Sequence, residues 1–140
     1  MTRRREPITA VALTVLVLLA GCGSSKPASV EEQFLRGVEQ IRGSTSAQKL
    51  HEQLVRTVAG LRRQRGATAA ARRTRLAVEG FASTLVGLDA QLDLIENDSG
   101  NIEAAIRDAR KADRYRTKGA NLLRAAGRAF GIEVGRLRGY

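Results

Sequence analysis

Residues 78–95 read VEGFASTLVGLDAQLDLI, and this stretch decides the fold class. Its large apolar residues recur at alternating intervals of three and four positions, at Val78, Phe81, Leu85, Leu88, Leu92 and Ile95. Such intervals return a side chain to one face of an α-helix, whereas a half-buried strand would need an alternation of two. The stretch therefore predicts a long amphipathic helix, which we place from Thr68 to Glu96.

The same periodicity predicts two shorter helices before this one. The first begins at Ser29, because Ser29 and Glu32 have the spacing of a capping box, and it ends at Gly43. The second begins near residues 44–46 and ends at Gly66. Their predicted core residues are Phe34, Leu35, Val38, Ile41, Ala47, Leu50, Leu54, Val58 and Leu61.

A fourth helix is predicted after the turn sequence Asn-Asp-Ser-Gly at residues 97–100. It begins at Asn101, and its apolar face comprises Ile102, Ile106, Ala109, Leu123, Ala126, Phe130, Val134 and Leu137. Five of the ten residues in 110–119 are basic and few are apolar. Whether the helix continues through that segment is left open.

These helices together predict the architecture of residues 30–140. No stretch shows the two-residue alternation of a strand, and the connecting loops are short. Loops of about two to eight residues make consecutive helices antiparallel. We therefore expect an all-α domain, an up-down-up-down antiparallel four-helix bundle.

The first 21 residues have the layout of an export signal. Three arginines at residues 3–5 precede an uncharged apolar run at residues 8–20. As a helix that run is about 20 Å long, whereas the hydrocarbon core of a membrane is about 30 Å thick. We therefore expect a signal peptide, with the basic end kept in the cytoplasm and the rest of the chain exported by general secretion.

The apolar run ends in Leu19-Ala20-Gly21-Cys22. This sequence resembles the lipobox of bacterial lipoproteins. The resemblance implies that signal peptidase II recognises Leu19, Ala20 and Gly21 and cuts before Cys22, which receives a diacylglyceryl group and can receive an N-acyl chain. Residues 1–21 would then be removed. The alternative is an unmodified cysteine at the end of an uncleaved signal anchor.

Lipidation would set the location of the mature protein. Two or three acyl chains give durable membrane attachment, whereas a single chain binds only marginally. The resemblance therefore implies an exported protein that has membrane lipid as its partner through Cys22. It would be held on the outer face of the cell membrane, or on the outer membrane if the host has one. Residues 22–29 would form the lipidated cysteine and a flexible tether, because residues 23–29 are small, polar and include a proline.

Charge changes sign in blocks along the chain, which carries 24 Lys and Arg against 14 Asp and Glu. Residues 49–75 and 107–138 are rich in basic side chains, whereas residues 79–103 contain acidic side chains and no basic ones. In the predicted bundle, the turn near residue 66 lies at the tether end, and Arg136 and Arg138 reach the same end. The acidic residues would then lie at the far end.

Six arginines flank that turn, namely Arg62, Arg63, Arg65, Arg72, Arg73 and Arg75. We expect them to form a basic, membrane-proximal pole that contacts anionic lipid headgroups or an anionic envelope polymer. The alternative is a solvated basic face without a ligand, since arginines are favourable near the end of a helix.

The composition argues against an enzyme, a metal site and a nucleic-acid site. One cysteine and one histidine cannot build a tetrahedral zinc site. His51-Glu52 lacks the second histidine of a zinc protease motif, because Val55 occupies that position. Ser83 and Thr84 have no histidine partner in the sequence, and no base-reading motif is present. We expect no catalytic residue, and no cofactor besides the acyl chains.

Two functions remain open. The first is a non-enzymatic helical interaction module, anchored in the bacterial envelope, with an anionic or a protein partner. The second is a lipid-anchored binding protein that holds an apolar ligand between its helices. Aromatic residues make up only 4% of the chain, which disfavours the second, because small-molecule pockets are commonly lined by aromatic side chains.

Overall fold

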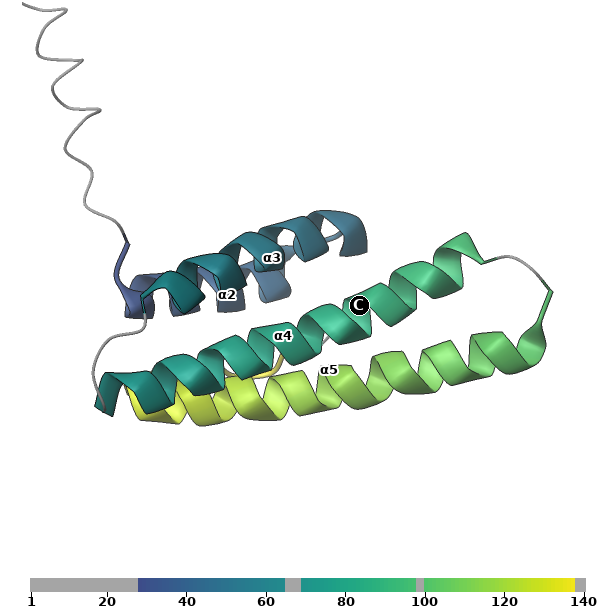
Figure 1. Ribbon diagram of the computed structural model, residues 1–140. Helices are drawn as coiled ribbons and strands as arrows, with labels where there is room; N and C mark the ends of the chain where they lie inside the picture. Colours follow the sequence, from purple (N-terminus) through teal and green to yellow (C-terminus); the bar gives the residue numbers. More distant parts are fainter. Residues whose placement is uncertain (1–27, 65–68, 98–99, 138–140) are drawn as a thin grey trace, which may run out of the picture.

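The computed structural model describes residues 28–64, 69–97 and 100–137, and within these ranges the regular structure is entirely helical. The helices are α2 (Val30–Gly43), α3 (Ala47–Arg63), α4 (Ala69–Glu96) and α5 (Ile102–Phe130). Figure 1 shows them gathered into a bundle. The all-α class and the helical bundle are therefore confirmed.

Side-chain caps set the starts of three helices. The Ser29 hydroxyl accepts a hydrogen bond from the backbone N–H of Glu32, whose carboxylate accepts one from the N–H of Ser29. This confirms the predicted capping box. Ser46 caps α3 and Asn101 caps α5 in the same way, each through a side-chain oxygen that accepts a backbone N–H. α3 ends at Arg63, and Gly66 lies outside the described residues.

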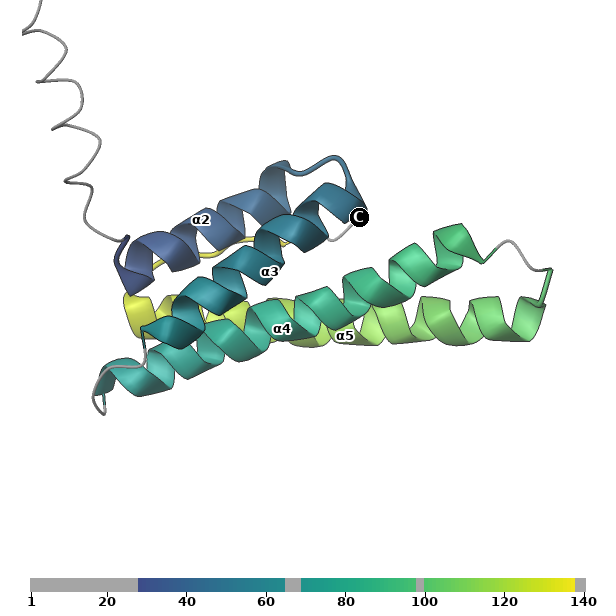
Figure 2. The ribbon, with the colours of Figure 1, turned by 45° about the horizontal axis from the view of Figure 1, so that its top comes forward.

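The helices form a short hairpin, α2–α3, and a long hairpin, α4–α5 (Figure 1). The short helices have 14 and 17 residues and the long ones 28 and 29. At about 1.5 Å per residue, the long helices reach well beyond the short ones. The short hairpin covers the half of the long hairpin that contains the start of α4 and the end of α5, as both views show (Figures 1 and 2). We call the projecting end, residues 92–97 and 100–110, the distal arm.

The core lies between the two hairpins. Phe34 of α2 contacts Phe81 of α4 and Phe130 of α5, with ring centroids 5.9 and 4.9 Å apart. The chain contains three phenylalanines, so all of them meet here and join three helices. The largest fully buried side chains are Phe34, Phe81, Leu50, Leu54, Leu61, Leu88 and Leu123.

α4 and α5 approach each other closely through small residues. A Cβ added at Gly119 would lie 3.0 Å from the backbone oxygen of Gly80, and one added at Gly87 would lie 3.1 Å from the backbone oxygen of Ala112. α5 is continuous through residues 110–119, because the small residues of this segment pack against α4. Buried Ala112 and Gly119 face α4, while most of the basic side chains of that segment are exposed.

α5 ends at Phe130, earlier than the sequence pattern predicted. Gly131 adopts a positive φ of 71°, and the N–H groups of Gly131 and Ile132 donate to the carbonyl oxygens of Arg128 and Gly127. This is a Schellman motif, in which a left-handed glycine reverses the chain and satisfies the last carbonyl groups.

The segment after α5 runs back along α2 instead of continuing the helix (Figure 2). The guanidinium group of Arg42, near the end of α2, donates a hydrogen bond to the carbonyl oxygen of Val134. Val134 and Leu137 pack on the core, but from an extended segment. Arg136 therefore lies toward the end of α2 and away from its start, contrary to the expectation, and Arg138 lies outside the described residues.

The predicted core is wrong in the distal arm. Ile95, Ile102 and Ile106 lie on the predicted apolar faces, yet they are 66%, 73% and 45% exposed. Ala109 is exposed as well. The physical reason is length, because the short hairpin ends before it reaches these side chains. Leu35, also predicted as core, is 37% exposed on α2.

Candidate functional site

The end of the bundle at which α2 starts carries a group of exposed arginines. The start of α2, the end of α3, the start of α4 and the end of α5 all lie toward the left of Figure 1. Arg62 and Arg63 of α3 and Arg72 and Arg75 of α4 are exposed there. We call these four residues the basic cluster. Arg65, also expected in it, lies outside the described residues.

Arg73 differs from its neighbours because it is turned inward. Its guanidinium carbon lies 5.0 Å from the centre of the Phe130 ring, and its Nε atom is buried without a hydrogen-bond partner. Successive residues of a helix point in directions about 100° apart, so Arg73 faces α5 while Arg72 and Arg75 face solvent. Arg73 therefore packs against α5 instead of lying with the exposed arginines, and its contact with an anionic surface stays a prediction.

The basic cluster is largely unneutralised. Arg75 Nε lies 3.9 Å from a carboxylate oxygen of Glu79 one turn away, and both side chains are exposed, so the attraction is weak. Within the described part of the chain, no carboxylate lies within ion-pair distance of Arg62, Arg63 or Arg72. The cluster therefore presents a positive potential to solvent.

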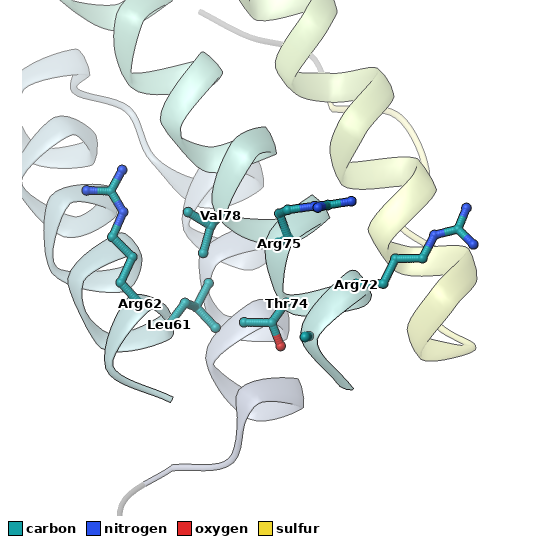
Figure 3. Close-up of a pocket in the computed structure, with 7 residues that line it drawn as sticks. Leu61, Arg62, Arg72, Thr74, Arg75 and Val78 are labelled. Carbon is teal, nitrogen blue, oxygen red and sulfur yellow. The ribbon is translucent and has the colours of Figure 1, made fainter. Parts of the chain in front are cut away.

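A cavity of about 480 Å³ opens between α3 and α4 within this cluster. Its lining combines apolar side chains with arginines and consists of Leu61, Arg62, Ala71, Arg72, Thr74, Arg75 and Val78. In Figure 3, Leu61, Thr74 and Val78 lie between the two helices, and the guanidinium groups of Arg62 and Arg72 lie on opposite sides of them. Sequence reasoning missed this cavity, because its lining combines side chains from two different helices, α3 and α4.

The far end of the molecule is not uniformly acidic, contrary to the expectation. Asp89, Asp93 and Glu96 are exposed on α4, but the adjacent stretch of α5 exposes basic residues. These are Arg107, Arg110, Lys111 and Arg114. The part of the long hairpin that contains these residues therefore carries both signs of charge, and Asp98 lies outside the described residues.

His51 is part of a contact between helices. Its Nε2 atom lies 2.7 Å from Oδ1 of Asp89, which links α3 to α4. Sequence reasoning missed this pair, since the two residues lie far apart in the chain. Among the described residues, no three His, Cys, Asp or Glu side chains are grouped so that they could hold a metal ion. Thr84 is buried and its hydroxyl donates to the carbonyl oxygen of Gly80.

The predicted lipidation site, Cys22 with Leu19, Ala20 and Gly21, lies outside the described residues. Within the described ranges, no helix combines the length with the apolar character that crossing a membrane requires. Comparison with known protein families, with curated proteins and with solved structures finds no match to this chain.

Proposed function

We propose that the protein is an exported bacterial lipoprotein whose helical domain is a non-enzymatic interaction module at the membrane surface. The observation that carries the proposal is the sequence Leu19-Ala20-Gly21-Cys22, which follows a basic and an apolar segment. The single cysteine of the chain occupies the position that a lipobox requires. Cys22 would hold the protein on the outer face of the cell membrane, or on an outer membrane if the host has one.

The proposal includes an up-down-up-down order of the helices, with the basic cluster next to the membrane. Two hydrogen bonds support this orientation. The carbonyl oxygen of Ala28 accepts from the side-chain amides of Gln33 and Gln64, at 2.8 Å each. Gln64 follows directly after α3, so the chain enters the domain beside the turn that the basic cluster flanks.

The free tether is then shorter than the sequence pattern suggested. Ala28 is held by the domain, which leaves residues 23–27 between the lipidated cysteine and the bundle. Five extended residues span at most about 18 Å. A domain held this closely brings its arginines within reach of anionic headgroups, where each contributes about 1 kcal/mol to surface binding. Anionic lipid is therefore the partner that we favour over an envelope polymer or a protein.

The anchor is tested by intact-mass and N-terminal analysis of the protein from the membrane fraction. We expect a chain that begins at Cys22 and carries two or three acyl chains. The matched variant Cys22→Ala should accumulate with residues 1–21 still attached, or be released from the membrane. An intact chain with an unmodified thiol would contradict the proposal.

A second candidate function is a lipid-anchored protein that holds an apolar ligand between its helices. One observation favours it, namely the apolar floor of the cavity between α3 and α4, formed in part by Leu61 and Val78. The arginines of the basic cluster surround this apolar floor, so a ligand that binds there would contact both apolar and positively charged side chains.

A further inference from the structure

We infer that the cavity between α3 and α4 binds one anionic phospholipid, with the first part of an acyl chain on the floor and its phosphate bound by arginines at the edge, Arg62 of α3 and Arg72 and Arg75 of α4, whose exposed side chains turn toward the cavity when the lipid binds. The inference rests on the proposed function, because the lipid comes from the membrane to which Cys22 attaches the domain. It adds a defined ligand site to what is otherwise a charged surface.

The floor suits an acyl chain. Leu61 is fully buried beneath the cavity, Val78 is half-buried at its side, and Ala71 contributes a small side chain that leaves space. The volume of about 480 Å³ falls within the range of about 300 to 1,000 Å³ that is usual for small-molecule sites. Apolar surface in such a concave site is favourably covered by hydrocarbon.

The arginines at the edge of the cavity, which we call the border, suit a phosphate. Arginine binds phosphate oxygens through two parallel N–H donors, which makes it the preferred cation for this group. Arg62 and Arg72 come from different helices, and their guanidinium groups point outward on opposite sides of the floor (Figure 3). Both side chains are exposed and free to turn toward a phosphate above the floor. Neither has a carboxylate partner within the described part of the chain, so both are available to a ligand.

Only a ligand with both chemistries uses the whole site. A free phosphate would leave the apolar floor in contact with water, and a neutral hydrocarbon would leave the arginines unpaired. An anionic amphiphile matches both parts. Membrane lipid is the source, because the hydrogen bond between Ala28 and Gln64 fixes the cavity at the end of the domain where the tether begins.

The experiment uses the full chain purified from membranes in mild detergent, with retained lipid counted by native mass spectrometry. The probes are phosphatidylglycerol, phosphatidylcholine and inorganic phosphate. We expect one molecule of phosphatidylglycerol per chain, at least tenfold lower occupancy by phosphatidylcholine, and no retention of phosphate. Equal retention of the two lipids would overturn the inference.

Two variants test separately how the apolar floor and the arginines of the border contribute to lipid binding. Ala71→Trp fills the cavity without changing the charge, and Arg62→Gln with Arg72→Gln removes charge without changing the floor. Each should lower the retention of phosphatidylglycerol at least tenfold. The control Arg107→Gln with Arg110→Gln removes the same charge from exposed positions on the distal arm and should retain lipid normally. Every residue replaced in these variants is exposed, so we expect the variants to fold. Thermal unfolding of each variant checks this.

The outcomes distinguish the cavity from the proposed function. If Ala71→Trp retains lipid normally while the double variant of the basic cluster loses it, the arginines bind headgroups only at the surface. The cavity inference is then wrong, and the membrane-facing module stands. If the control loses as much lipid as the cluster variant, the effect is general electrostatics, and the inference is again wrong. The same spectra report the acyl chains on Cys22, so an unacylated chain that retains lipid as expected would support the cavity and contradict the anchor.

Discussion

The covered part of the long hairpin and the distal arm have the same apolar periodicity and different surroundings. In the covered half, Phe81 and Leu123 are fully buried against the short hairpin. In the distal arm, Ile95 and Ile102 continue the same faces but are largely exposed. Periodicity therefore identifies which face of a helix is apolar, whereas burial depends on whether a neighbouring helix is long enough to cover that face.

The largest effect should come from the covered half, at the point where three helices meet. Phe34→Ala removes the ring that contacts Phe81 and Phe130, and we expect a loss of about 3 to 5 kcal/mol in the free energy of unfolding. Urea denaturation followed by circular dichroism measures it. A loss below about 1 kcal/mol would mean that the two hairpins are not held together by this cluster.

The contact between α4 and α5 should be almost as sensitive to added volume. Gly119→Ala places a Cβ 3.0 Å from the backbone of Gly80 and of Thr84, where the neighbours cannot easily move. We expect this substitution to destabilise the fold by about 1 to 3 kcal/mol, because the free-energy cost of overpacking exceeds the gain of about 1 kcal/mol from the higher helix propensity of alanine. Gly43→Ala is the matched control, since a Cβ there meets nothing within 4 Å. It should be neutral or stabilising, and equal melting temperatures of the two variants would contradict the close approach.

Two adjacent arginines provide a smaller comparison. Arg73→Gln removes the cation above the Phe130 ring, and we expect a loss of about 1 kcal/mol in stability. Arg72→Gln alters an exposed side chain and should change stability by less than about 0.5 kcal/mol. Thermal unfolding of both variants measures the difference. The reverse order of stability would show that Arg73 is not packed in the fold.

The smallest effect is expected in the distal arm. Ile102→Ser should change the free energy of unfolding by less than about 0.5 kcal/mol, because this side chain is already 73% exposed. Amide hydrogen exchange should be faster in residues 102–108 than in residues 119–126, since the arm has fewer buried contacts. Strong protection of the arm in the isolated protein would mean that something covers it in solution.

Local signals predicted the elements of this fold better than their packing. The capping box at Ser29 and the cap at Asn101 depend on neighbouring residues, so the sequence was sufficient to place them. The end of α5 was missed because a local pattern does not tell which of several glycines ends a helix. Here the segment that follows Gly131 also contacts Arg42 of α2. Gly127 stayed helical, whereas Gly131 adopted a positive φ.

The candidate site was predicted only in part. The accumulation of arginines near the turn was visible in the sequence, but the inward position of Arg73 depends on the ring of Phe130, which comes from another helix. The cavity and the contact between His51 and Asp89 also depend on the spacing of α3 and α4. Contacts of this kind are set by tertiary packing, which a local pattern does not encode.

The hydrogen bond from Arg42 to Val134 joins residues 92 positions apart, and this has a consequence for the order of folding. Contacts between neighbouring helices form early because they close short loops, whereas contacts of large sequence separation form late. The chain emerges N-terminus first during synthesis, so α2 is made long before the segment that covers it. The apolar face of α2 therefore stays incompletely covered until the last residues of the chain have emerged.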